Sequence, residues 1–155
     1  MREIAGQLNA EGMSFGIIIS RFNNLFTNQL LQGAKDCLER HGADVSQVTV
    51  VWTPGANELP LAARRLALDP KVDAVIALGC VVQGATPHAD LINNQVARAL
   101  ANIAMECDKP VINSIVAANT LEQAIERSGT KAGNKGWDGA LAAIEMVSLL
   151  RQLKA

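Results

Sequence analysis

Aromatic residues and histidine are scarce in this sequence. Only 3% of its 155 residues are aromatic, none is a tyrosine, and two are histidines. Two histidines are too few for a catalytic zinc site built from several imidazole ligands, and the zinc motif HExxH and the dinucleotide motif GxGxxG are both absent. The sequence therefore predicts no metal centre.

Charge of one sign and long hydrophobic runs are also lacking. The 14 Lys and Arg nearly cancel the 15 Asp and Glu, which leaves a net charge of -1, and we expect no nucleic-acid partner. The longest apolar runs have the length of a strand, well short of the roughly 20 residues that span a bilayer, so we expect no membrane partner. No basic stretch leads into an apolar stretch near the N-terminus, and we expect no secretory signal.

Cysteine is rare and unpatterned. The sequence has three cysteines, Cys37, Cys80 and Cys107, in apolar surroundings without CxxC or Cys/His ligand spacing. An odd number in such surroundings favours free buried thiols in a cytoplasmic protein over a disulfide framework.

The residues that are abundant indicate a folded domain. Hydrophobic residues make up 49% of the chain and charged residues 19%, which is too apolar for a disordered chain. Since a domain typically has about 100 to 200 residues, we expect one domain over residues 1–155.

Four continuous runs of apolar and β-branched residues predict strands. They lack the alternation of apolar and polar residues that marks a strand with one solvated face, so they are typical of a parallel sheet covered on both faces. The predicted strands are 15–20, 48–52, 74–78 and 111–116.

Segments with helical periodicity lie between these runs. The first begins after the capping candidates Asn23 and Asn24 and stops at Gly42, and the others are centred on 61–68, 91–103, 120–127 and 137–150. A loop is expected over 79–87, and residues 120–123 fit a capping box. This order predicts an α/β fold, a three-layer α/β/α sandwich with a four-stranded parallel, flavodoxin-like sheet.

Ligands of such sheets bind outside the carboxyl ends of the strands. Segment 79–88 is the most suggestive there, because Gly84 lets the backbone approach a ligand, the Thr86 hydroxyl can hold an anion, and His88 is near enough in sequence to donate a proton to a ligand or accept one from it. The alternative is structural: Thr86 as a helix cap, Pro87 as a first helical residue and His88 as a solvated side chain. Both interpretations remain open from this segment alone.

Other polar and aromatic residues near strand ends are equally ambiguous. Phe22 can stack on a planar ligand or anchor a core, and Glu58 can accept ligand hydroxyls or favour the first turn of a helix. Arg127 can clamp a phosphate or favour a helix C-terminus. Segment 128–136 lacks the Gly-Lys-Ser/Thr order of a Walker A loop, and we reject a nucleoside-triphosphatase site.

Taken together, these segments resemble the lumazine synthase family. The resemblance covers nearly the whole chain and rests on motifs in a compatible order: RFN at 21–23, PGANELP at 54–60, GATPH at 84–88 and EQAIERSGTKAGNKG at 122–136. It implies an enzyme of riboflavin biosynthesis that condenses 5-amino-6-ribitylaminouracil with 3,4-dihydroxy-2-butanone 4-phosphate to 6,7-dimethyl-8-ribityllumazine, without a metal or organic cofactor.

The resemblance also implies roles for individual residues. Phe22 stacks on the pyrimidine ring, and His88 shuttles protons. The phosphate is held by Ala85, Thr86 and Arg127. The ring and the ribityl chain are lined by Ala56, Asn57, Glu58, Cys80, Val81 and Val82.

Members of the family build the site between subunits, which implies that Asn113, Arg127 and Lys135 come from a neighbour of the subunit that supplies Phe22 and His88. The resemblance implies self-association into pentamers, and the short connector before residue 136 resembles members that form an icosahedral shell of about 60 subunits. Residues 1–14 resemble the family segment that pairs with a neighbouring subunit.

Four positions depart from the usual family pattern. Asn57 and Ala89 stand where aromatic residues are common, Asn113 where phenylalanine faces the ring, and Gln83 where arginine is common. Loss of a stacking ring costs on the order of 1 kcal/mol, which motivates a second hypothesis: a weak or inactive flavin- or lumazine-binding scaffold that forms a shell. A third is an unrelated monomeric flavodoxin-like module that binds phosphate.

Overall fold

The computed structural model describes residues 1–129 and 133–154. Within them the chain forms four strands, five α-helices and two short 3-10 turns. In chain order these are β1 (Phe15–Ser20), α1 (Asn24–Arg40), η1 (Val45–Gln47), β2 (Thr49–Thr53), η2 (Ala56–Glu58), α2 (Leu59–Ala67), β3 (Ala74–Val82), α3 (His88–Cys107), β4 (Val111–Ala118), α4 (Leu121–Arg127) and α5 (Lys135–Lys154).

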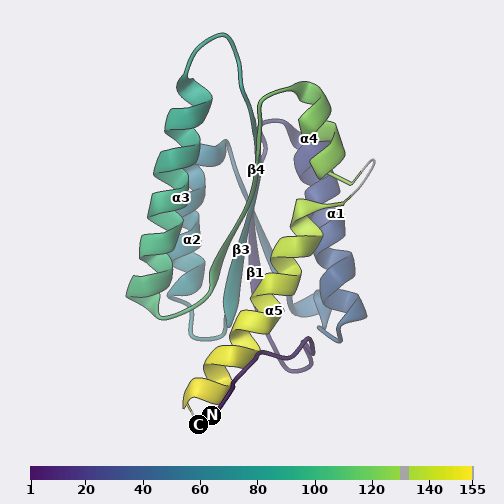
Figure 1. Cartoon of the computed structure of the whole chain (residues 1–155), viewed down its shortest axis with the longest axis vertical. Coiled ribbons are helices and arrows are strands. Elements are labelled where there is room, and N and C mark those ends of the chain that lie inside the picture. The colour runs from purple at the N-terminus through teal and green to yellow at the C-terminus, as the bar shows by residue number, and fades with distance from the viewer. Residues whose placement is uncertain (130–132, 155) are drawn as a thin grey trace.

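The strands form one parallel sheet with the order β2-β1-β3-β4. Figure 1 shows α2 and α3 on one side of this sheet and α1, α4 and α5 on the other. The predicted three-layer α/β/α sandwich with a four-stranded parallel, flavodoxin-like sheet is therefore confirmed.

The central strand β1 shows why an uninterrupted apolar run suits this position. All six of its residues are buried, and neighbouring side chains point to opposite faces. Ile17 and Ile19 belong to the core under α1 and α5, whereas Ile18 belongs to the core under α2 and α3. Since both faces are covered by helices, no position of β1 needs a polar side chain.

The structure corrects the prediction for the third strand. The loop expected over 79–87 begins only after Val82, because β3 continues alongside β4 as far as the pair Val82 and Ala118. Gly79 and Cys80 lie in this ladder opposite Ile115 and Val116. Local composition pointed to a loop there, but pairing with the neighbouring strand decides the conformation.

Helix α1 begins differently from the prediction. Asn23 precedes it, but its side chain does not cap the helix; the backbone is left-handed, with a φ of 62°. The Asn23 Nδ2 instead donates a hydrogen bond of 2.8 Å to the carbonyl oxygen of Cys80. This contact ties the turn after β1 to β3.

The predicted capping box before α4 is confirmed in one half. The Thr120 Oγ1 accepts a hydrogen bond of 3.1 Å from the Gln123 N–H. The return bond goes to a neighbouring residue, because the Gln123 Oε1 accepts from the Asn119 N–H rather than from that of Thr120. Helix α5 starts at Lys135, slightly earlier than the predicted start near residue 137.

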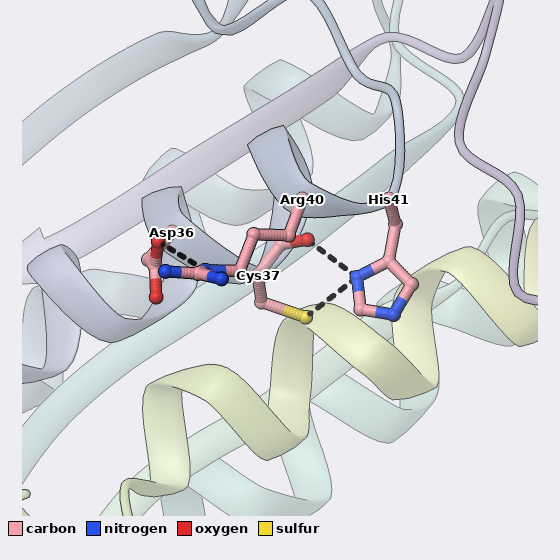
Figure 2. Close-up of polar contacts among 4 residues, drawn as sticks. All are labelled: Asp36, Cys37, Arg40 and His41. Carbon is pink, nitrogen blue, oxygen red and sulfur yellow. Dashed lines mark hydrogen bonds and ion pairs between the residues drawn. The ribbon is translucent and has the colours of Figure 1, made fainter.

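The C-terminal end of α1 is closed by local hydrogen bonds (Figure 2). The His41 Nδ1 lies 2.6 Å from the Cys37 carbonyl oxygen, which can only accept, so this ring nitrogen carries the proton. Arg40 pairs with Asp36 at 2.9 Å one turn earlier. The His41 ring also meets the Trp137 ring of α5 edge-on, with centroids 6.0 Å apart.

The N-terminal segment lies against α5 of its own chain. The Gln7 N–H donates to the Ser148 Oγ at 2.9 Å, and the Gln152 Nε2 donates to the Ala5 carbonyl at 2.8 Å. Figure 1 shows the two termini side by side at the end of α5. Residues 1–14 form no strand in the described chain.

Across the described residues, no helix is both long enough and apolar enough to cross a membrane.

Helices α1 and α5 approach each other closely at Gly136. A Cβ built on Gly136 would overlap the carbonyl group of Leu30 in α1. Because the obstacle is backbone rather than the end of a flexible side chain, the two helices would have to separate to admit even one methyl group.

We therefore expect Gly136→Ala to lower the free energy of unfolding by about 1 to 3 kcal/mol. Gly84→Ala is the matched control, since a Cβ at Gly84 meets nothing within 4 Å, and we expect it to change stability by less than about 0.5 kcal/mol. Denaturant unfolding of both variants measures the difference. Equal midpoints for the two would contradict the close approach.

Candidate active site

A pocket of about 400 Å³ opens at the carboxyl ends of β1, β2 and β3. It lies where parallel sheets of this kind bind ligands, beside the start of α3. The pocket brings together these residues expected from the sequence: Phe22, Ala56, Asn57, Glu58, Cys80, Val81, Val82, Thr86 and His88. Gly84 and Thr86 on either side of Ala85 line it, whereas Ala85 itself does not.

Phe22 is held by an extension of the β1–β2 pairing beyond both strands. The Arg21 N–H donates to the Thr53 carbonyl at 2.8 Å, and the Phe22 N–H donates to the Pro54 carbonyl at 3.1 Å. Its backbone is therefore fixed, while the residue is 71% exposed. A planar ligand that stacks on this exposed ring would bury its apolar surface, which favours binding.

The segment after β2 turns back over the pocket as η2. The Thr53 Oγ1 donates to the Gly55 carbonyl at 3.1 Å, and the Glu58 N–H donates to the same carbonyl at 3.3 Å. Glu58 is exposed, and one of its carboxylate oxygens lies above Gly55. This carboxylate can accept hydrogen bonds from the hydroxyl groups of a ligand.

The end of β3 forms an apolar and uncharged wall. Cys80 is 2% exposed, and burial raises the pKa of its thiol to about 11. Val81 and Val82 are half-buried beside it. Since a neutral thiol is a poor nucleophile, Cys80 can pack against a ligand but is unsuited to attack it.

The start of α3 faces the pocket with its backbone donors open. Pro87, not Thr86, precedes the helix, and no side chain caps this end. The alternative that Thr86 is a helix cap and Pro87 a first helical residue is therefore wrong. His88, the first residue of α3, is exposed and lines the pocket. The free N–H groups of the first turn can hold an anion next to the imidazole.

Asn113, Arg127 and Lys135 lie outside this pocket. Arg127 and Lys135 border a separate hollow of about 180 Å³, and the Arg127 Nη1 donates to the Ala117 carbonyl at 2.9 Å. Asn113 is exposed on β4, and its Oδ1 accepts from the Ile115 N–H at 3.1 Å. A single protomer therefore does not bring these side chains to His88. Part of the motif at 122–136, residues 130–132, lies outside the described residues.

Several residues of the pocket were not assigned to the site from the sequence. Ser20 ends β1 beside the pocket, and Asn23, Gly55, Ala89 and Ile92 complete its lining. Two signals could have identified some of them. Ser20 is the one polar residue of an otherwise apolar strand, and Ile92 follows His88 by four residues, which places both on one helix face.

Cys37 and His41 form the other pair that could suggest a nucleophile, with the Sγ 3.7 Å from the His41 Nδ1 (Figure 2). Burial is the largest cause that raises the pKa of the Cys37 thiol to about 11, with smaller contributions from the carboxylates of Asp36 and Asp138. The Nδ1 already carries a proton for the Cys37 carbonyl and cannot accept one from the thiol. The pair therefore stabilises the helix end and has no catalytic geometry.

Residues 12–16 match the GxSxG pattern of hydrolases but lack its structure. In a hydrolase the serine sits on a turn that follows a strand. Ser14 instead precedes β1, at the end of the sheet opposite the pocket, and its N–H donates to the Asp73 carboxylate at 2.8 Å. Among residues 1–129 and 133–154, no three His, Cys, Asp or Glu side chains gather in a way that could hold a metal ion.

Comparison with known proteins identifies the family. A sequence model described as 6,7-dimethyl-8-ribityllumazine synthase matches residues 12–151. Proteins with the name 6,7-dimethyl-8-ribityllumazine synthase from Clostridium kluyveri and Aquifex aeolicus are each 49% identical over 154 residues, covering 99% of this chain and 100% of theirs. The chain belongs to the 6,7-dimethyl-8-ribityllumazine synthase family.

Family membership confirms the resemblance that the four sequence motifs indicate. It also excludes an unrelated flavodoxin-like phosphate-binding module, because the match to the lumazine synthase family runs along almost the entire chain.

The burial of two of the three cysteines predicts different reactivities for their thiols. At about pH 8, native protein should react with iodoacetamide at Cys107 at least roughly tenfold faster than at Cys37 or Cys80, because the latter two are buried and stay protonated. Mass spectrometry of the alkylated peptides measures the three rates. Protein unfolded in guanidinium is the control and should lose the difference; rapid native labelling of Cys80 would contradict a neutral wall.

Proposed function

We propose that the chain condenses 5-amino-6-ribitylaminouracil with 3,4-dihydroxy-2-butanone 4-phosphate to 6,7-dimethyl-8-ribityllumazine, a step of riboflavin biosynthesis. The observation that carries the proposal is the pocket that joins Phe22, Glu58 and His88 at one edge of the sheet, in a chain of this family. The reaction requires a planar amine, a polyhydroxyl chain and a phosphorylated ketone to meet, and the pocket has a surface suited to each.

The pyrimidine amine occupies the apolar half of the pocket. Its ring stacks on Phe22 and lies against the wall formed by Cys80, Val81 and Val82, all of which border the pocket. The ribityl chain extends along η2, where the Glu58 carboxylate accepts hydrogen bonds from its hydroxyl groups. Ala56 and Asn57 line the same side.

The phosphate of the second substrate lies at the start of α3. The open N–H groups of this helix, together with Ala85 and the Thr86 hydroxyl, provide donors and a favourable helix dipole. Arg127 and Lys135 of a neighbouring subunit complete the charge neutralisation, since neither borders this pocket within a protomer.

His88 moves the protons of the reaction. The amine attacks the ketone and water leaves to form an imine; phosphate is then eliminated, the enol tautomerises, and the second amine closes the ring with loss of another water. Each step needs a group that both donates and accepts a proton near neutral pH, which imidazole can do. None needs a protein nucleophile, so positioning of two substrates supplies much of the acceleration.

The proposed site requires assembly, and we propose pentamers that close into an icosahedral shell, in the cytoplasm. Exposed apolar side chains at the rim support an interface there, because Phe22 and Leu25 are 71% and 73% exposed. Asn113 on the exposed edge strand β4 would face the ring bound by a neighbour. Residues 1–14 would add to a neighbour's sheet. Three free thiols suit a reducing compartment.

Mixing both substrates with the purified protein should produce the fluorescence of the lumazine, whereas a protein that only binds would change the emission of added ligand without forming product.

His88→Ala should slow turnover by roughly 10- to 1000-fold while keeping the assembly, because it removes the proton shuttle and leaves positioning intact. His41→Gln is the control, since His41 lies at the far end of α1, and its turnover should stay within about twofold. Unchanged turnover in His88→Ala would remove this residue from the mechanism.

Arg127→Ala should mainly raise the KM for the phosphorylated ketone, by roughly tenfold or more, because it removes a charged phosphate contact.

Subunits that carry His88→Ala and subunits that carry Arg127→Ala should restore activity when they are unfolded and reassembled together. If the two residues come from different subunits, about a quarter of the sites in an equal mixture regain both. No recovery in mixed assemblies of the correct size, measured by light scattering, would contradict a shared site.

A further inference from the structure

Asn134 makes an unusual number of contacts for a residue in a surface connector. Its Oδ1 accepts hydrogen bonds from the N–H groups of Gly136 at 2.8 Å and Trp137 at 3.2 Å, the second and third residues of α5. Its Nδ2 donates to the Gln29 carbonyl of α1 at 2.9 Å. One amide thus caps α5 and ties it to α1.

Glycines surround this amide and leave space for it. A Cβ on Gly33 of α1 would overlap the Asn134 side chain. A Cβ on Gly129 would lie 2.9 Å from the Asn134 Nδ2, and one on Gly136 would lie 3.0 Å from the Oδ1. The amide is therefore enclosed by α1, by the end of the connector and by α5 itself, and few other orientations are open to it.

The backbone of Asn134 closes the connector. Asn134 pairs with Ser128 in an isolated antiparallel bridge, and Ser128 is anchored to α4 by its Oγ, which donates to the Ala124 carbonyl at 2.6 Å. Arg127 immediately precedes one end of this bridge, and Lys135 immediately follows the other. Both cations and Asn134 border the same hollow of about 180 Å³.

We propose that Asn134 is a positioning residue that sets the spacing of Arg127 and Lys135 for the substrate phosphate. Long Arg and Lys side chains already lose rotamer freedom when they bind a phosphate, and a fixed backbone origin for both avoids an additional loss of backbone freedom. The inference rests on the proposed function, because it assigns the phosphate to these two cations.

The decisive variant is Asn134→Ser, which keeps a neutral oxygen able to cap α5 but cannot reach the Gln29 carbonyl. We expect the KM for 3,4-dihydroxy-2-butanone 4-phosphate to rise by roughly 5- to 50-fold. The KM for the pyrimidine amine should stay within about twofold, and so should kcat, because Phe22 and His88 are untouched. The loss of a cap alone would not separate the two substrates in this way.

A second variant protects the test against misfolding. Gly33→Ala keeps residue 134 as asparagine, but its Cβ would overlap the Asn134 amide, and alanine is a better helix former than glycine in the middle of α1. It should raise the same KM. Asp44→Ala is the matched control, since Asp44 caps η1 by accepting from the Ser46 N–H at 3.1 Å, far from both cations, and should leave both KM values unchanged.

Titration with inorganic phosphate separates this inference from the proposed function. If wild-type protein forms no lumazine, the proposed function fails; weaker phosphate binding by Asn134→Ser than by wild type would still support the positioning role. If wild type is active and both Asn134→Ser and Gly33→Ala keep its KM for the phosphorylated ketone, the positioning role is overturned. A parallel rise in the KM of both substrates would also overturn it, because that indicates a general structural effect.

Discussion

Parallel pairing of β1 between β2 and β3 is the constraint on which the rest of the molecule depends. Because successive side chains of β1 enter opposite cores, a shift of one residue would exchange both sets of contacts, and the register is therefore strongly specified. The pairing continues past the strands through Arg21 and Phe22, and the Asn23 amide extends it to the Cys80 carbonyl. Loops that are distant in sequence are thus held at one edge of the sheet.

The chemistry of that edge follows from this arrangement. The wall formed by the end of β3 is apolar, and burial keeps the Cys80 thiol neutral. Glu58 and His88 stand exposed at the rim, where a ligand can reach them. Such a pocket can hold and orient two substrates without forming a bond to either, which suits a reaction whose steps are mainly proton transfers and losses of small molecules.

A second support lies on the opposite face of the sheet, where α1 and α5 nearly touch. Gly136 lets the α5 backbone contact Leu30, and the His41 and Trp137 rings meet where α1 ends. The Asn134 amide lies at the same contact and connects the helices directly. Lys135 therefore starts from one of the most tightly packed parts of the surface. In the proposed function, this packing holds the Lys135 backbone in a fixed position relative to the phosphate of a substrate bound by the neighbouring subunit.

Local sequence was sufficient for much of the fold, and its failures have identifiable causes. The strand predicted at 15–20 is confirmed without change, because an unbroken β-branched run has few alternatives. The end of β3 was wrongly predicted as a loop, since Gly79 is a poor strand former and only pairing with β4 overrides its preference. The cap predicted at Asn23 was wrong for a similar reason: its amide is used by a residue far along the chain.

By itself, the sequence determined the layers, the edge of the sheet at which the pocket opens and, through its motifs, the family. These depend on hydrophobic periodicity and on residues close together in the chain. Only the tertiary structure decided that Ser20, Asn23 and Ile92 enter the pocket, that Arg127 and Lys135 lie away from it, and that Asn134 joins two helices. Each of these depends on contacts between segments distant in sequence. A local sequence pattern does not specify which distant backbone group a side chain will contact, because that depends on how the whole chain packs.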